Sequence, residues 1–199
     1  MEEEEQEHIP EYTDIPPIFQ SYLTGTYFDR CIACNKNLLE VGTQYLIEKA
    51  INRANAFKVE NVVFEYAICF DCTMDMQGKM SKESNEKIGE YFHSKVDLIH
   101  RREAYLAAGK FDPMEWIDTC LVSHEPVENL SEFQIYAHCE GPHLLFSVMP
   151  YMISGSVLEH LSGMLSKQTK DEMDGFVDEH FGGPPEFREL LKDKDVIVF

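Results

Sequence analysis

The sequence predicts an α+β protein made of two small units, each a β-hairpin followed by a helix. Three observations lead to this fold class. Short runs rich in β-branched and aromatic residues, 44–50 and 61–68, have the composition of strands. Apolar residues then recur at helical spacing over long stretches of both halves. Two Cys-x-x-Cys pairs bracket the first hairpin, which indicates that a metal ion helps to hold this small unit together.

The chain of 199 residues divides into three predicted parts. Residues 1–20 form an acidic arm, which we expect to be disordered because its carboxylates repel one another and its prolines oppose regular structure. Residues 21–110 form a first unit that binds metal and contains a long helix. Residues 111–199 form a second α+β unit without metal, and the Asp112-Pro113 pair marks the boundary between the two units.

Helical periodicity begins just after Cys72. It predicts a long helix over about 73–108, which could break near Ser81. In the second half the same spacing predicts a helix over about 154–180, followed by a Gly-Gly-Pro-Pro chain break. The apolar ending at 195–199 predicts a terminal strand.

The candidate metal ligands are Cys31, Cys34, Cys69 and Cys72. Zinc prefers four ligands in a tetrahedron, and each Cys-x-x-Cys turn presents two thiolates. The second pair lies where a strand gives way to a helix, whose free N–H groups and dipole stabilise negative charge. Four protein ligands leave no position for water, so we expect one structural zinc ion rather than a catalytic one. Iron, a redox-active cysteine pair and unligated thiols are alternatives. The redox pair is less favoured because a thioredoxin-like context is missing, and unligated thiols are less favoured because two Cys-x-x-Cys pairs in this context are unlikely to arise by chance.

The order of these features resembles treble-clef zinc fingers, in which a knuckle and a hairpin precede a second ligand pair on the first turn of a helix. The resemblance covers about residues 28–100 and concerns layout and ligand pairs. It implies a small metal-stabilised fold and carries no particular activity.

Segments of the two halves resemble one another in the same order, which predicts an internal repeat. On this alignment Cys120 survives in the second copy, while Ser123, Pro150 and Ile153 replace the other three cysteines. The second copy is therefore expected to be metal-free and held by apolar packing. Chance similarity between short helical segments is the alternative. The matched segments are 80–88 with 165–173, 31–38 with 120–127, 45–47 with 133–135, and 67–70 with 148–151.

A different interpretation of the second half competes with the repeat. Its two cysteines and two of its histidines have the right chemistry for a second zinc site, or for a Cys–His nucleophile pair. Gly141 and Pro142 restrict the geometry of one pair, which counts against the metal site. The residues concerned are Cys120, His124, Cys139 and His143.

Charge limits the classes of partner. The formal net charge is −19, which repels phosphate backbones and anionic membranes. No apolar run approaches the roughly 20 residues that span a bilayer, and the first residues, MEEEEQEHIP, do not resemble a secretory signal. We therefore expect a cytoplasmic protein whose partner is another protein.

Two functions remain at this stage. The first is a zinc-stabilised, non-enzymatic binding or adaptor protein, since the metal site is closed and no convincing catalytic group accompanies it. The alternative is a hydrolase or transferase with a Cys/His site in the second half, which would require a pocket joining at least two of its four candidate residues.

Overall fold

The structure is a computed structural model that describes residues 11–54 and 59–181. The predicted chain break at 182–185 and the predicted strand at 195–199 lie outside the described residues. Within them the molecule combines helices with one antiparallel sheet, so the α+β class is confirmed.

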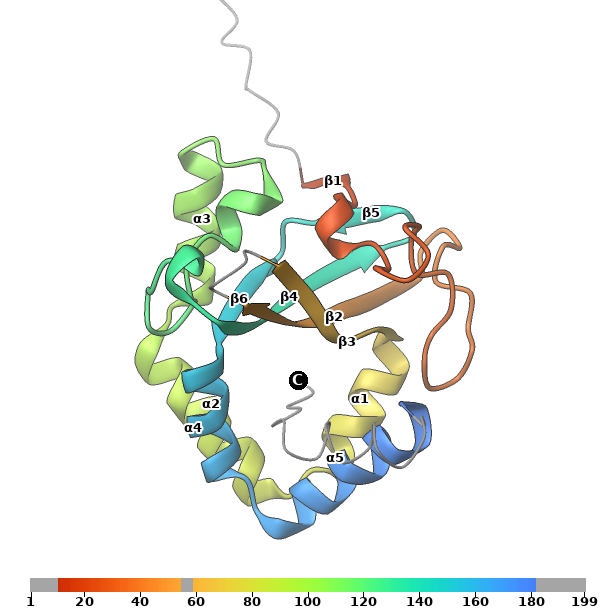
Figure 1. Cartoon of the computed structure of the whole chain (residues 1–199), viewed down its shortest axis with the longest axis vertical. Coiled ribbons are helices and arrows are strands. Elements are labelled where there is room, and N and C mark those ends of the chain that lie inside the picture. Colours follow the sequence, from red (N-terminus) through yellow and green to blue (C-terminus); the bar gives the residue numbers. More distant parts are fainter. Residues whose placement is uncertain (1–10, 55–58, 182–199) are drawn as a thin grey trace, which may run out of the picture.

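Six strands form the sheet, in the order β1-β5-β4-β2-β3, with β6 also paired to β4 (Figure 1). The predicted strands of the first hairpin are confirmed as β2 and β3, which pair along their full length. Central strands β2 and β4 are also antiparallel neighbours, so both halves of the chain contribute to one continuous sheet. The strands are β1 (Tyr12–Asp14), β2 (Gln44–Ala54), β3 (Val59–Cys69), β4 (Glu132–Glu140), β5 (His143–Leu145) and β6 (Tyr151–Ser154).

The expected break near Ser81 is confirmed, but the two long helices predicted from periodicity are otherwise wrong in their continuity. The first stretch forms three helices and the second forms two, because the chain is extended at Met80, Val96 and Leu165. Ser81 and Ser166 follow two of these breaks and act as N-caps, each accepting a backbone N–H of the next helix. The helices are α1 (Phe70–Lys79), α2 (Lys82–Lys95), α3 (Leu98–Ala107), α4 (Gly155–Met164) and α5 (Lys167–His180), with 3-10 turns η1 (Pro17–Phe19), η2 (Pro113–Trp116) and η3 (Val127–Asn129).

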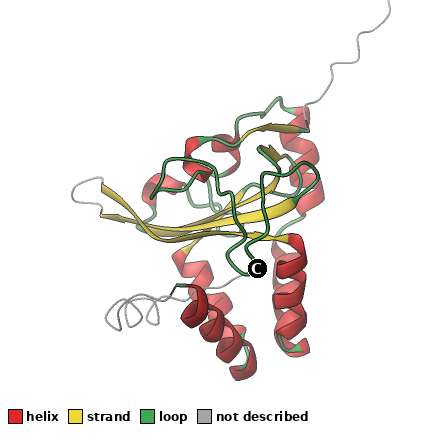
Figure 2. Cartoon of the chain, turned by 90° about the vertical axis from the view of Figure 1, so that its right-hand side faces the viewer, coloured by secondary structure: helices red, strands yellow, loops and turns green. Residues whose placement is uncertain are grey.

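Four helices project from one face of the sheet (Figures 1 and 2). Helices α1 and α5 lie on one side of this layer, and α2 and α4 lie together on the other (Figure 1). The alternation of side chains along β2 and β3 sends Glu48, Phe64 and Tyr66 toward the helices. There the ring of Tyr66 packs edge-on against Phe176 of α5 and Phe181 just after it.

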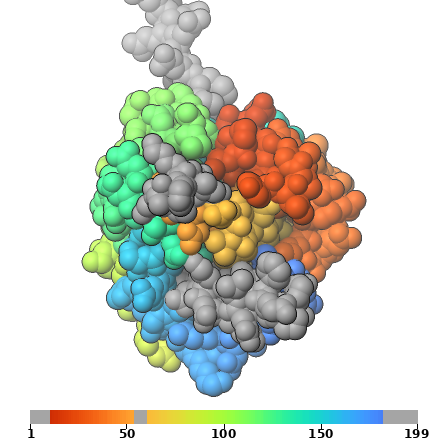
Figure 3. All heavy atoms as spheres, in the orientation of Figure 1, coloured from red at the N-terminus to blue at the C-terminus, as the bar shows by residue number. Residues whose placement is uncertain are grey.

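The N-terminal segment covers part of the opposite face of the sheet, where Ser21 donates to Glu65 of β3 and Lys49 of β2 donates to the carbonyl of Gln20. It lies beside β3 in Figure 3. Residues 11–20 differ from the predicted disordered arm over 1–20, because β1 and η1 form there, whereas residues 1–10 lie outside the described residues. Ile15 and Phe19 are buried, and β1 adds to the sheet beside β5. The arm is therefore part of the core from Ile15 onward, because its apolar residues cover sheet surface that would otherwise face water.

The same backbone contacts occur at matching places in the two halves. In the first, the N–H of Cys31 donates to the carbonyl of Lys36, and Asn35 closes the turn with φ of 60°. In the second, Cys120 donates to Glu125, and His124 has φ of 57°. Each turn then bonds to a strand, since Ile32 donates to Ala67 and Leu121 donates to Met152. The two turns thus attach in the same way to the strands that lead into α1 and α4.

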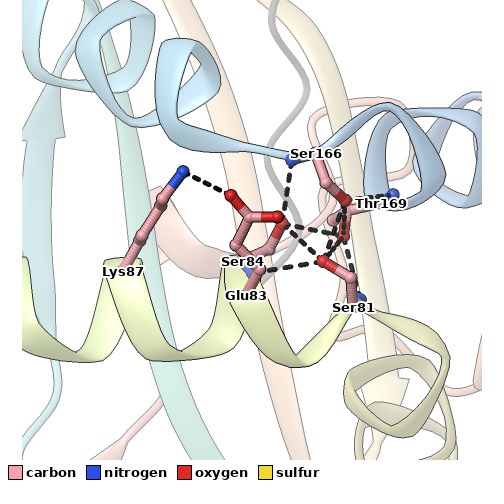
Figure 4. Close-up of polar contacts among 6 residues, drawn as sticks. All are labelled: Ser81, Glu83, Ser84, Lys87, Ser166 and Thr169. Carbon is pink, nitrogen blue, oxygen red and sulfur yellow. Dashed lines mark hydrogen bonds and ion pairs between the residues drawn. The ribbon is translucent and has the colours of Figure 1, made fainter.

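Helices α1 and α2 are one consecutive pair along the chain, and α4 and α5 are the other. The two pairs meet through a cluster of four hydroxyl side chains, drawn in Figure 4. The backbone N–H of Ser81 donates to Thr169 Oγ1 of the other pair, and that of Ser166 donates to Ser84 Oγ. Oxygen atoms of Ser81 and Ser166 lie 2.8 Å apart, and the side chains of Ser84 and Thr169 are fully buried. Each N-cap is therefore completed by the third residue of the other helix, which joins the two halves of the helical layer.

Candidate metal centre

The four candidate ligands come from two places that the fold brings together. Cys31 and Cys34 lie on the turn that bonds to β3, and this turn needs a left-handed residue, which Asn35 supplies. Cys69 ends β3 and is the N-cap of α1, while Cys72 lies in the first turn of that helix. Strand, turn and helix end therefore present all four sulfur atoms to one point.

The distances fit a tetrahedral metal ion. All four sulfur atoms lie within 4.8 Å of one another, and those of Cys34 and Cys69 are 3.7 Å apart. Zinc–sulfur bonds of about 2.3 Å in a tetrahedron place neighbouring sulfur atoms about 3.8 Å apart. The separation is far longer than a disulfide bond of about 2.05 Å, and all four cysteines are free. The cluster could hold one metal ion, and its four soft ligands suit zinc.

Electrostatics around the thiols favour a bound cation. Burial acts to raise the pKa of Cys31, but N–H groups of Cys69, Cys34 and Ala33 outweigh it and lower the pKa to about 7. Burial and the neighbouring thiols raise the pKa of Cys72. The protein alone therefore favours the thiolate of Cys31 and opposes those of Cys69 and Cys72, whose pKa values are raised. Four thiolates at this spacing repel one another unless a cation lies between them.

The second half preserves the position of Cys31 but not the other ligands. The N–H of Cys69 donates to Cys31 Sγ at 3.3 Å, and the N–H of Ser154 donates to Cys120 Sγ at the same distance. Ser154 is also the N-cap of α4, as Cys69 is of α1. The counterpart of Cys69 is thus Ser154 rather than the predicted Pro150. By the same helix position, Val157 rather than Ile153 is the counterpart of Cys72.

The structure does not bring together the other candidate residues of the second half. Cys139 is buried on β4 beside Tyr45, and burial raises its pKa, whereas Cys120 lies against Ser154. His143 packs on Tyr12 near Asp14. Among the described residues, the four cysteines of the first half form the one group able to hold a metal ion. A second zinc site, or a Cys–His nucleophile pair, built from Cys120, His124, Cys139 and His143 therefore has no support in the structure.

Sequence reasoning did not single out a buried carboxyl group in the centre of the sheet. Glu48 is 3% exposed, accepts a hydrogen bond from the hydroxyl of Tyr66, and leaves its Oε1 without a partner. Burial raises its pKa to about 8. Tyr136 and Tyr151 complete this polar group on the neighbouring strands. The only sequence signal was a Glu within a predicted strand. Alternation alone does not decide whether its side chain lies on the buried or the exposed face of the sheet.

Comparison with protein-family models, with curated proteins and with solved structures finds no match to this chain. None of the helices in the described ranges has the length and apolar character needed to cross a bilayer.

Proposed function

We propose that this chain is a zinc-stabilised, non-enzymatic binding or adaptor protein whose metal ion is held by Cys31, Cys34, Cys69 and Cys72. The observation that carries this proposal is the convergence of four thiols at tetrahedral spacing. Four protein ligands fill the coordination sphere of zinc, so the ion has a structural role and activates no water.

The position of the site explains what the ion would stabilise. It joins the turn at Cys31 to the junction of β3 and α1, where helix packing against the sheet starts. Metal binding to a set of ligands that is absent from the unfolded chain adds directly to the free energy of folding. We therefore propose that the ion fixes the direction of α1, and with it the surface that α1 forms with α5.

We further propose that the chain is a tandem of two treble-clef-like units, at about 21–110 and 111–199, with a metal-free second unit. Its support is the recurrence of the turn, strand and cap contacts described above. In the second unit, the N–H of Ser154 donates to Cys120 Sγ and the Cys120 thiol donates to the hydroxyl oxygen of Ser154, so hydrogen bonds replace metal bonds there.

The partner we propose is a protein, encountered in the cytoplasm. The net charge of −19 disfavours nucleic acid and anionic membranes.

The test of this function is metal content together with thermal stability. We expect about one zinc per chain by elemental analysis, with loss of the metal and a lower melting temperature in Cys69→Ser, because one missing ligand opens the tetrahedron. Cys139→Ser is the matched control, since it removes a buried cysteine outside the cluster and should keep the metal. A wild-type protein without metal, whose melting is unchanged by a chelator, would contradict the proposal.

A further inference from the structure

A cavity of about 680 Å³ lies where the last residues of β2 and the first residues of β4 meet the start of α4. Its size falls within the range of about 300–1,000 Å³ that holds small organic ligands. Phe64, Leu130 and Leu158 contribute apolar wall, and the hydroxyl groups of Ser154 and Ser156 lie near the helix end. The cavity is separate from the four-cysteine cluster, none of whose residues lines it.

Two small residues, Ala50 and Gly155, line the cavity. Antiparallel pairing sets Ala50 of β2 opposite Gln134 of β4, which also lines it. The first residue of α4 is Gly155, whereas α1 begins with Phe70.

At the start of α1, Phe70 packs on His138 of β4 with ring centroids 5.2 Å apart. At the start of α4, neither Gly155 nor the nearby Ala50 carries a ring. Gly155 also permits close approach, because a Cβ atom there would lie 3.1 Å from Cβ of Glu132.

The charge of the cavity selects the ligand. Glu125, Glu132 and Glu159 are among the described residues that line it, and no Lys, Arg or His is among them. Carboxylates around a partly apolar cavity attract a cation and repel an anion.

A buried amide supplies a second and independent feature of the site. Gln134 lines the cavity, is 4% exposed, and accepts a hydrogen bond at its Oε1 from the hydroxyl of Tyr136. Its Nε2 group makes no hydrogen bond with any described residue. Gln134 lines the cavity, so an oxygen atom of a bound ligand can accept a hydrogen bond from this Nε2 group.

We propose that this cavity binds a small organic cation: an ammonium group at the glutamates, an apolar body against Phe64 and Leu158, and a carbonyl or hydroxyl oxygen that accepts from Gln134 Nε2. The first half of the fold then holds the metal ion, and residues of both halves line the ligand cavity.

The test is a titration of the full-length protein with L-phenylalaninamide, which has an ammonium group, an apolar ring and an amide oxygen. The anion N-acetyl-L-phenylalanine is the matched probe, and binding is followed by ¹H–¹⁵N NMR. We expect saturable shifts that include the Gln134 side-chain amide with the cation, and binding at least about tenfold weaker with the anion. Gln134→Leu should weaken binding of the cation about fivefold, the value of one ordinary hydrogen bond.

Rim charge is tested with Glu125→Gln/Glu159→Gln, for which we expect about fivefold weaker binding. Glu128→Gln is the control, because Glu128 is exposed on η3 and does not line the cavity. Equal binding of the two probes, an equal loss in the control, or no saturation at about 10 mM in a protein whose spectrum is folded would each overturn the proposal.

Discussion

At the scale of single residues, Glu48 makes stability depend on pH. Its pKa is raised by burial from 4.5 to about 8, so the folded state holds a proton that the unfolded chain releases between these values. The free energy of unfolding therefore falls as pH rises through this interval, and the contribution is lost above about pH 8. We expect Glu48→Gln to remove this slope and to be more stable than wild type at about pH 9 by a few kcal/mol. Urea unfolding at several pH values measures it, and parallel curves for the two proteins would contradict it.

A second residue-scale prediction concerns the buried ion pair that holds the N-terminal segment. Lys49 Nζ lies 3.0 Å from Glu65 Oε2 and also donates to the carbonyl of Gln20, while Glu65 accepts from the N–H of Tyr22. Removing the ammonium leaves a carboxylate buried without its counter-ion. We expect Lys49→Met to cost about 3 kcal/mol in unfolding free energy, and Lys49→Met/Glu65→Gln to recover part of this loss. A single variant as stable as wild type in urea would contradict this role.

The same pair should respond to acid. Burial acts to raise the pKa of Glu65, but the N–H of Tyr22 and the Lys49 ammonium outweigh it, so the folded pKa lies below 4.5. The stability from this group is present above the unfolded value and is lost as pH falls through the folded value. In an acid titration followed by circular dichroism, Glu65→Gln should flatten the loss of stability below about pH 4.5. An unchanged slope would assign acid unfolding to other carboxylates.

At the scale of elements, the hydroxyl cluster should couple the two helix pairs. Ser84 and Thr169 each accept the N–H of the other pair's N-cap. Ser84→Ala and Thr169→Val should each cost about 1–2 kcal/mol, because each leaves a backbone N–H without its partner. The double variant should show a coupling energy of at least about 0.5 kcal/mol in urea unfolding. Ser94→Ala, which removes an exposed hydroxyl on α2, is the control, and strictly additive losses would show that the pairs act independently.

The elements also show what the sequence could and could not predict. Alternation and composition predicted β2 and β3, and cysteine spacing selected the four residues that lie together. A break near Ser81 was anticipated, whereas the breaks at Val96 and Leu165 were missed because both residues keep the apolar spacing while their backbone is extended. Pairing of β2 with β4 was missed because strand patterns assign faces and not neighbours. The cavity depends on that pairing, so Gln134 gave no signal before the sheet was known.

At the scale of the whole molecule, the two halves place different side chains around a similar arrangement of turn, strand end and helix start. If the second half is a unit that lacks its metal ligands, those ligands can be restored. Ser123, Ser154 and Val157 occupy the places of Cys34, Cys69 and Cys72, and Cys120 is already present. We expect Ser123→Cys/Ser154→Cys/Val157→Cys to bind one more zinc ion than wild type, because four thiolates then meet at a helix start. Elemental analysis counts the ions, and cobalt substitution reports tetrahedral thiolate ligation.

The double variant Ser123→Cys/Ser154→Cys is the control for this last prediction, since it offers three thiols and should hold the second ion more weakly. A triple variant that remains folded and binds no additional metal would contradict the prediction. It would show that the two halves share backbone contacts but that the second half does not direct the four cysteine side chains to one point. Additional tetrahedral metal would instead mean that the backbone of the second half still has the geometry of a metal site, although hydrogen bonds to Cys120 now hold it in place.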